Sequence, residues 1–185
     1  IRDRLSSVAI DDEKAGETIV DYLIEHGHTK IAEIGANLEL SQTARLRHNG
    51  YLNSLKKHGI TPDERYYERA RFSYDSAYRA MKKLLEKDIE ITAVYAISDV
   101  MAIGALRAIL DKGLRVPEDI SITGFDGSTL AEYYNPKIVS IRQPHKDMAA
   151  RSVELLFNMI DLHKGSCHEI IPFELTEGKS VARID

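Results

Sequence analysis

The stretch that decides the fold is ITAVYAISDVMAIGALRAILDKGLRVPEDISITGFD, residues Ile91–Asp126. It begins with a short apolar run at 93–97, a pattern typical of a strand that is buried on both faces. Ser98 can then cap a helix, which Gly113 would end. A second apolar run follows at 120–125. Two such strands joined by one helix predict parallel strands with a right-handed crossover.

The rest of the chain repeats this alternation of strand-like and helix-like patterns. Pro172 lies in the last strand-like run and favours an edge position, because proline cannot donate a ladder hydrogen bond. The predicted strands cover residues 7–10, 31–35, 65–72, 137–142 and 169–175, and the further predicted helices cover 14–26, 43–57, 74–86 and 146–162. Residues 127–136 are expected to form a loop. The fold class is therefore α/β, with an open, mostly parallel sheet flanked by helices.

Composition narrows the classes of protein. The chain has 185 residues, enough for one α/β domain with a sizeable core, and a formal net charge of −4. It therefore lacks the basic excess that marks a nucleic-acid-binding surface. Cys167 is its only cysteine, which excludes a disulfide framework and fits a reducing cytosol. No apolar run reaches the roughly 20 residues needed to span a bilayer.

Polar residues follow several of the predicted strands. Ser98 and Asp126 both stand where a strand ends, and ligands of open α/β sheets bind beyond the carboxyl ends of the strands. Arg45 and Arg47 follow another strand and lie about 200° apart on a helix, so only one of them can face a crevice. A solvated surface position is the ordinary expectation for an arginine.

Several motifs of the chain resemble a known family. TAVYAISDVMAIGAL (92–106), GLRVPEDISITGFD (113–126) and SIRQP (140–144) look like parts of the effector-binding core of the LacI/GalR family of bacterial transcription regulators. They occur in the family's order, and the resemblance extends over essentially the whole chain. It implies a periplasmic-binding-protein-like fold with two lobes.

The resemblance also implies a division of the chain. Residues of about 12–138 and 166–176 would form the effector lobe. Residues of about 139–162 would belong to the other lobe, most of which would precede Ile1 in the full protein. A DNA-binding headpiece would precede that lobe, so it is absent from the present chain.

A ligand site follows from the same resemblance. The family has an arginine ahead of a glycine–aromatic pair, which selects Arg47 over Arg45. The predicted ligand-binding residues are Thr43, Arg47, Phe72, Ser98, Asp126 and Gln143. Arg47 would donate hydrogen bonds, Asp126 would accept them from paired hydroxyls, and Phe72 would stack on a sugar ring. This chemistry suits a neutral, polyhydroxylated effector, although the family usually has asparagine where Ser98 stands.

Several of these residues also have purely structural interpretations. Phe72 could be an ordinary core phenylalanine, and the carboxylate of Asp12 could simply favour the positive end of the following helix. His26 and His28 flank Gly27, where we expect a helix end and a turn. A metal site there would need further ligands at suitable spacing.

The predicted helix that starts at Asp99 is apolar nearly all round, with Arg107 as the main exception. One face can cover the sheet, so we expect the opposite face to meet a second subunit. The predicted homodimer interface contains Met101, Ile103 and Tyr134. Adjacent tyrosines beside a proline fit this position, because interfaces are rich in tyrosine.

The sequence therefore predicts the effector-binding and dimerisation part of a cytoplasmic LacI-type regulator. A small molecule, most simply a carbohydrate, would bind between the lobes and change operator affinity allosterically. Operator DNA would be bound only through the headpiece, and no membrane partner is expected. A sugar receptor of a transport system is the alternative, against which a dimerising helix argues. We expect no enzyme, cofactor or metal site, since no Walker A, G-x-G-x-x-G or G-x-S-x-G motif is present.

Overall fold

The computed structural model describes residues 6–161 and 166–184. Its larger part is a sheet of six strands: β2 (Ile31–Gly35), β3 (Tyr67–Arg69), β4 (Ala93–Ala96), β5 (Ser121–Asp126), β6 (Val139–Arg142) and β8 (Glu174–Thr176). Their order across the sheet is β3-β2-β4-β5-β6-β8. All neighbours pair parallel except β6 and β8, which are antiparallel. The predicted α/β fold with an open, mostly parallel sheet is confirmed.

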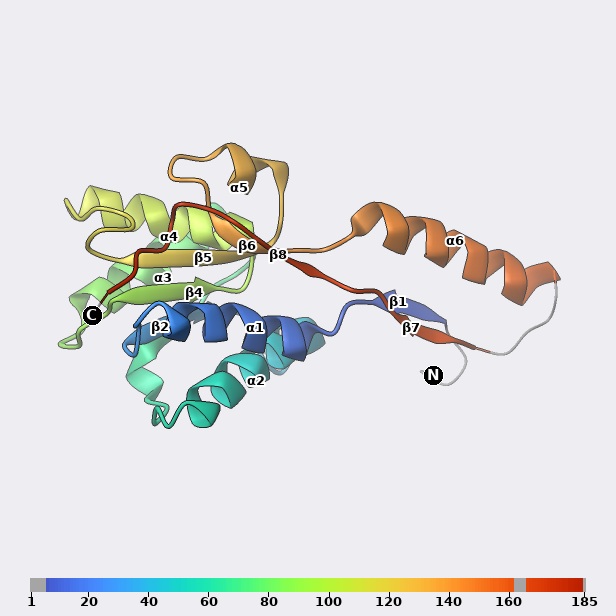
Figure 1. Ribbon diagram of the computed structural model, residues 1–185, viewed down its shortest axis with the longest axis horizontal. Helices are drawn as coiled ribbons and strands as arrows, with labels where there is room; N and C mark the ends of the chain where they lie inside the picture. Colours follow the sequence, from blue (N-terminus) through green and yellow to red (C-terminus); the bar gives the residue numbers. More distant parts are fainter. Residues whose placement is uncertain (1–5, 162–165, 185) are drawn as a thin grey trace.

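Two long helices cover each face of this sheet (Figure 1). They are α1 (Asp12–Glu25), α2 (Gln42–Lys57), α3 (Tyr74–Glu86) and α4 (Asp99–Asp111). α1 packs against α2 on one face, and α3 packs against α4 on the other. Ser41, Ser73 and Ser98 cap α2, α3 and α4, because each hydroxyl accepts a hydrogen bond from a backbone N–H of the first turn.

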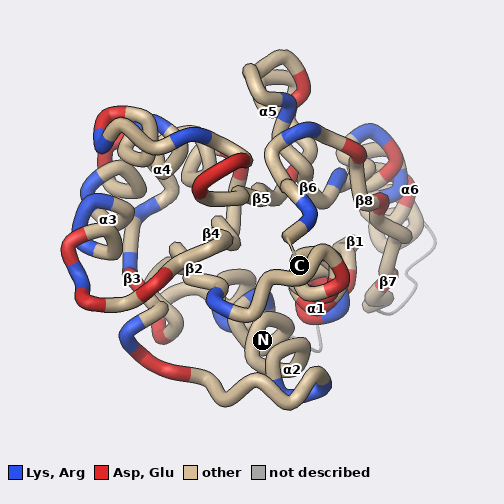
Figure 2. Tube along the Cα trace, turned by 60° about the vertical axis from the view of Figure 1, so that its left-hand side comes forward, with Lys and Arg blue, Asp and Glu red and all other residues tan. Residues whose placement is uncertain are grey.

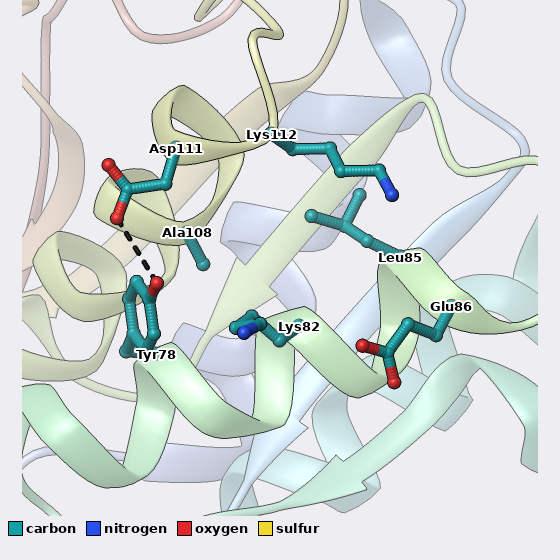
Figure 3. A pocket seen from close by; sticks show the side chains of 7 residues that line it. All are labelled: Tyr78, Lys82, Leu85, Glu86, Ala108, Asp111 and Lys112. Atoms are coloured by element: carbon teal, nitrogen blue, oxygen red, sulfur yellow. Dashed lines mark hydrogen bonds between the residues drawn. The ribbon is translucent and has the colours of Figure 1, made fainter.

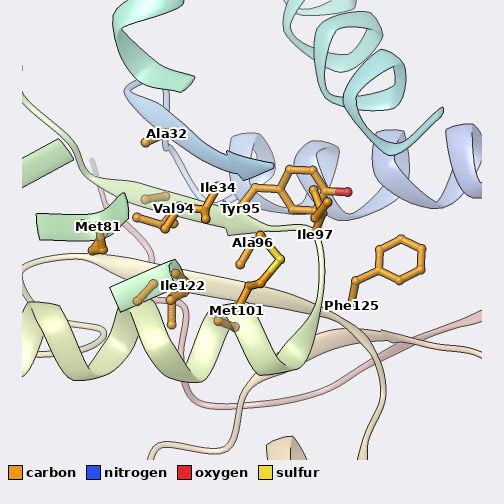
Figure 4. Packing of buried hydrophobic residues seen from close by; sticks show 14 of the residues in the cluster. Ala32, Ile34, Met81, Val94, Tyr95, Ala96, Ile97, Met101, Ile122 and Phe125 are labelled. Carbon is orange, nitrogen blue, oxygen red and sulfur yellow. The ribbon is translucent and has the colours of Figure 1, made fainter. Parts of the chain in front are cut away.

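The hydrophobic core lies between the sheet and these helices. Every residue of β2 and β4 is buried, as expected for strands that are covered on both faces. Figure 4 shows Met101 of α4 and Met81 of α3 on the side of the sheet that carries Val94. The ring of Tyr95 stands on the opposite side, toward α1 and α2.

A smaller body lies beside the sheet (Figure 1). It contains helix α6 (His145–Asp161) and a parallel pair of strands, β1 (Ser7–Ala9) and β7 (His168–Ile170). The predicted end of this helix at Leu162 lies outside the described residues. Several large apolar side chains of α6 are exposed: Val153, Leu156, Phe157 and Ile160.

Two predicted strands differ from the structure by more than their end residues. The run 65–72 forms only β3, because the Asp63 side chain accepts a backbone hydrogen bond and starts a 3-10 turn at Glu64–Tyr66. The run 169–175 is divided at Pro172 into β7 and β8, which belong to different sheets. Proline has no N–H to donate, so it favours such a break in a ladder.

The expected division of the chain also needs correction. Residues 139–142, which we assigned to the other lobe, form β6 and pair with β5 and β8 in the large sheet. Residues 168–170, which we assigned to the effector lobe, pair with β1 beside α6. The expected loop at 127–136 contains a short helix, α5 (Thr129–Tyr133), which Ser128 caps.

Charges of both signs are interspersed along the outer helices and loops (Figure 2). On this surface, Lys and Arg therefore alternate with Asp and Glu instead of gathering into one basic stripe. Across the part of the chain that the structure describes, no helix combines the length and apolar character needed to cross a bilayer.

Candidate functional site

The carboxyl edge of the sheet brings three of the predicted ligand residues together. Asp126 is the last residue of β5, Gln143 directly follows β6, and Arg47 reaches the same place from α2. Gln143 Nε2 donates to Asp126 Oδ1 over 2.7 Å. Arg47 Nη1 lies 3.5 Å from the same carboxylate oxygen. We call Arg47, Asp126, Gln143 and Asp12 the ligand cluster; Asp12 is described below.

Arg47 is a firmly anchored member of the ligand cluster. Its side chain is only 5% exposed, Nε donates to Asp12 Oδ1 over 2.8 Å, and Nη1 donates to the carbonyl oxygen of Ile97 over 2.6 Å. The guanidinium carbon lies 3.5 Å from the centre of the Phe125 ring, a cation–π contact. The ordinary expectation of a solvated surface arginine is therefore wrong here. Arg45, by contrast, is exposed.

Asp12 is a member of the cluster that sequence reasoning missed. The cap of α1 is Asp11, whose Oδ1 accepts a hydrogen bond from the backbone N of Lys14 over 2.9 Å. Asp12 turns inward and pairs with Arg47. Two adjacent aspartates before a helix carry no sign of which one caps. The position of Arg47, more than thirty residues further along, decides the role of Asp12.

Asp126 has an unusual electrostatic and backbone environment. Burial raises the pKa of its carboxyl group, while the charge of Arg47 and the hydrogen bond from Gln143 oppose this effect. Its φ is 111°, in a region that residues other than glycine rarely adopt. Asp12 and Asp126 place two carboxylates around one guanidinium. The cluster therefore contains one more carboxylate than guanidinium groups. This excess gives it surplus negative charge and additional hydrogen-bond acceptors.

Ser98 and Asp99 have structural roles at the start of α4. Ser98 is buried, and its Oγ accepts a hydrogen bond from the backbone N of Met101 over 3.3 Å. Its hydroxyl thus serves as a cap, and the residue is only 2% exposed, which leaves little surface for the ligand contact that we expected. Asp99 accepts hydrogen bonds from Ser140 Oγ and Ser128 N, both over 2.6 Å. These bonds tie α4 to β6 and α5, although burial raises the pKa of Asp99.

The other two predicted ligand residues lie at the same carboxyl edge of the sheet, without a direct bond to the ligand cluster. Thr43 is half-buried in the first turn of α2, one helical turn before Arg47 and on the same face. Phe72 is 50% exposed and directly precedes the cap of α3. The alternative that Phe72 belongs to the core is therefore wrong, and its ring has apolar area free for stacking.

The predicted dimer residues have different environments. Met101 is fully buried and Ile103 is 7% exposed. α3 covers the flank of α4 that we expected to need a second subunit. The two helices meet so closely that a Cβ on Gly104 would lie 2.3 Å from the carbonyl oxygen of Tyr74. The prediction of Met101 at a subunit interface is wrong, because its side chain is completely buried within this chain.

The apolar surface that α4 exposes is smaller than the sequence of this helix implied. It carries Ile103 and, two turns later, Leu110, whose side chain is exposed. The neighbouring helix α5 exposes Leu130 and Tyr133, and Tyr134 at its end is half-buried against the core. These five residues form what we call the α4/α5 patch.

A groove of about 340 Å³ lies between α3 and α4 (Figure 3). Tyr78 crosses it and donates a hydrogen bond from its hydroxyl to Asp111 Oδ2 over 3.1 Å. Leu85 and Lys112 line its far end, where both helices terminate. This end faces the amino edge of the sheet, whereas the ligand cluster lies at the carboxyl edge. The groove contains none of the predicted ligand residues.

His28 ties the end of α1 to the C-terminal segment. It is buried, and its two ring nitrogens lie 3.1 Å from Thr92 Oγ1 and from the carbonyl oxygen of Ala182. Burial lowers the pKa of His28, although the contact with Ala182 opposes this effect. Within residues 6–161 and 166–184, no three His, Cys, Asp or Glu side chains are grouped so that they could hold a metal ion.

The fold is a mostly parallel sheet flanked by helices, and the ligand cluster lies at the carboxyl ends of its parallel strands, where ligands of open α/β sheets bind. The sequence profile of the periplasmic binding protein-like domain matches residues 20–181, so the chain belongs to this family. The resemblance to the effector-binding core of LacI-family regulators is confirmed by individual relatives and solved structures.

One such relative is the HTH-type transcriptional regulator MalR of Clostridium butyricum, with 41% identity over 97% of this chain and 53% of its own length. A transcriptional regulator CelR–cellobiose complex superposes with a TM-score of 0.92 at 32% identity, covering 97% of this chain and 55% of that one. A LacI-family sugar-binding regulator from Escherichia coli, complexed with phosphate, gives 0.88 at 30% identity, over 96% and 64%. The chain thus spans about half the length of the curated relatives it matches.

Proposed function

We propose that this chain is the effector-binding and dimerisation part of a LacI-type transcriptional regulator of the cytoplasm. A small molecule bound at the ligand cluster would change operator affinity, and DNA would be bound through a headpiece outside this chain. The observation that carries the proposal is the convergence of Arg47, Asp126 and Gln143 at the carboxyl edge of the sheet. The regulators among its relatives support it.

The chemistry of the ligand cluster favours a neutral carbohydrate. Two carboxylates surround one guanidinium, so an added anion would meet a surplus of negative charge. The carboxylate of Asp126 is partly exposed and can accept hydrogen bonds from paired hydroxyls. The exposed ring of Phe72 can stack on the apolar face of a sugar. A structural neighbour that binds cellobiose supports this class of effector.

The coupling to DNA would come from the second lobe. The exposed apolar side chains of α6, with β1 and β7 beside them, are the surface on which the remainder of that lobe would pack. An effector held between two lobes favours the relative orientation in which both lobes contact it. Such differential binding shifts a two-state equilibrium, and the headpieces would gain or lose operator affinity with it.

A sugar receptor of a transport system remains the second candidate. Our expectation against it relied on an apolar helix face that needs a subunit partner, and α3 now covers much of that face. The regulators among the relatives and structural neighbours favour the first candidate instead. We propose no enzymatic role, because the cluster contains no nucleophile beside a base.

The effector site can be tested by calorimetric titration of the full-length protein with neutral disaccharides, monosaccharides, sugar phosphates and nucleosides. A neutral sugar should bind, and Asp126→Ala should weaken its affinity by at least tenfold, since losing a charge-assisted hydrogen bond costs about 1.5–3 kcal/mol. Arg45→Ala is a surface control that should leave the affinity unchanged, because Arg45 is exposed on the helix that carries Arg47. Unchanged affinity in Asp126→Ala would remove this cluster from the site.

We further propose that the α4/α5 patch is the homodimer interface. Ile103, Leu110, Leu130 and Tyr133 would face their counterparts about a two-fold axis, with Tyr134 at the edge. Tyr133→Glu would place an unpaired carboxylate in this contact and should halve the mass measured by light scattering. Leu40→Glu is the control, because Leu40 is equally exposed but lies in the loop before α2. An unchanged mass of Tyr133→Glu would contradict the interface.

A further inference from the structure

A row of polar side chains crosses the sheet beneath α2. Tyr67, Glu33, Tyr95 and Thr123 are successive partners in register on β3, β2, β4 and β5. Directly paired residues of parallel strands point to the same face of a sheet. Tyr51 of α2 stacks on Tyr95 with 6.4 Å between the ring centroids, so α2 covers this face. The row adjoins the ligand cluster but contains none of its residues, and the proposed function assigns it no role.

Three polar atoms of this row have no hydrogen-bond partner among the described residues. They are Glu33 Oε1, Tyr95 Oη and Thr123 Oγ1, and all three residues are completely buried. Buried polar atoms in folded proteins almost always have a partner, in the protein or in ordered water. Three unpartnered atoms on three adjacent strands at one register level therefore call for a common explanation.

The neighbouring polar groups are already engaged. His48 Nδ1 lies 2.6 Å from Glu33 Oε2, the other oxygen of the same carboxylate. The hydroxyls of Tyr51 and Tyr67 donate to backbone carbonyl oxygens over 2.9 Å and 2.7 Å. The missing partner of Glu33 Oε1 is therefore not one of these side chains.

We propose that this layer is an internal hydration site, in which a water molecule joins Glu33 Oε1 to Tyr95 Oη. Water has the required chemistry, because it donates to a carboxylate and both donates to and accepts from a hydroxyl. Buried waters typically make about three hydrogen bonds to groups that would otherwise be unsatisfied. Thr123 Oγ1, on the other side of Tyr95, offers a further partner to the water of this layer.

The hydration site adjoins the turn of α2 that carries Arg47, the anchoring residue of the ligand cluster. His48, which bonds Glu33, directly follows Arg47 in α2. Figure 4 shows the Tyr95 ring reaching past Ile97, whose carbonyl oxygen accepts a hydrogen bond from Arg47. The water and its partners therefore fasten the turn of α2 that carries Arg47 to the middle of the sheet.

A high-resolution crystal structure of the full-length protein tests the site directly. Electron density for a water within hydrogen-bond distance of both Glu33 Oε1 and Tyr95 Oη is the expected result. If Glu33 and Tyr95 instead turn into direct contact with each other, and no water lies between them, the proposal is overturned.

The sign of a stability change provides a second test. Tyr95→Phe removes only the hydroxyl; with the water in place, its partners lose a bond, and the thermal midpoint should fall by about 2–4 °C. Without the water, the substitution merely removes an unsatisfied hydroxyl, and the midpoint should rise. Thr123→Val should behave in the same way as Tyr95→Phe. Tyr133→Phe is the control, because the loss of this exposed hydroxyl should leave the thermal midpoint unchanged. A higher midpoint in either Tyr95→Phe or Thr123→Val overturns the proposal.

Discussion

Replacing Arg47 with methionine should destabilise the fold as well as remove a ligand contact. The guanidinium bonds Asp12 at 2.8 Å and the carbonyl oxygen of Ile97 at 2.6 Å, and it covers the Phe125 ring at 3.5 Å. Removing one partner of a buried ion pair typically costs about 3–5 kcal/mol. Asp126 remains partly hydrated after the substitution, and methionine refills part of the volume. We therefore expect a loss of about 3 kcal/mol in the free energy of unfolding.

Urea denaturation of the full-length protein measures this loss. The midpoint should move to lower urea at an unchanged slope, which marks a change in stability alone. Arg45→Met on the exposed side of the same helix should stay within about 0.5 kcal/mol of the wild type. Adding Asp12→Asn to Arg47→Met should recover part of the loss, because the stranded charge is then gone. A loss below about 1 kcal/mol in Arg47→Met would refute the anchoring role argued from the structure.

Three further predictions concern other positions of the fold. Gly50→Ala should lower stability by about 1–3 kcal/mol in calorimetry, because its Cβ would lie 2.2 Å from the carbonyl oxygen of Glu13 in α1; an unchanged midpoint would contradict this close approach. Ser98→Ala should cost about 1 kcal/mol in urea denaturation but leave effector affinity within about twofold, and a larger loss of affinity would restore Ser98 to the ligand site. Burial lowers the pKa of His28, so the unfolded chain binds the proton more readily than the folded chain does. The stability of the fold should therefore fall as pH drops below about 6.5. In a plot of urea midpoint against pH, His28→Gln should flatten this fall.

Apolar runs and serine caps were sufficient to predict most of the fold. The strand at 93–97, the cap at Ser98 and the following helix all appear in the structure within a residue of their expected places. The division of the run 169–175 at Pro172 was not predicted, because the choice between two partner strands depends on residues far away in the sequence. The apolar surface of α4 was misread for a similar reason, since nothing within α4 shows that α3 covers it.

The candidate site was predictable only where its signal is local. Asp126 stands at a strand end, and Arg47 has a motif that resembles the family's pattern. Asp12 gave no such signal, because its role depends on a guanidinium presented by another helix. The polar row of Glu33, Tyr95 and Thr123 is also invisible along the chain, since it exists only through the register of three strands.

At Asp126, the residue that supplies a carboxylate to the binding edge also has a strained backbone, which lowers the stability of the fold. A side chain at φ 111° carries strain of the order of 1–3 kcal/mol, which glycine would not carry. Directed evolution for heat tolerance alone would therefore favour Asp126→Gly, and the resulting protein would gain resistance while losing the carboxylate of its binding edge. Selection schemes for this lobe need to score ligand response together with thermal survival. Selection for thermal survival alone would favour variants that no longer respond to the ligand.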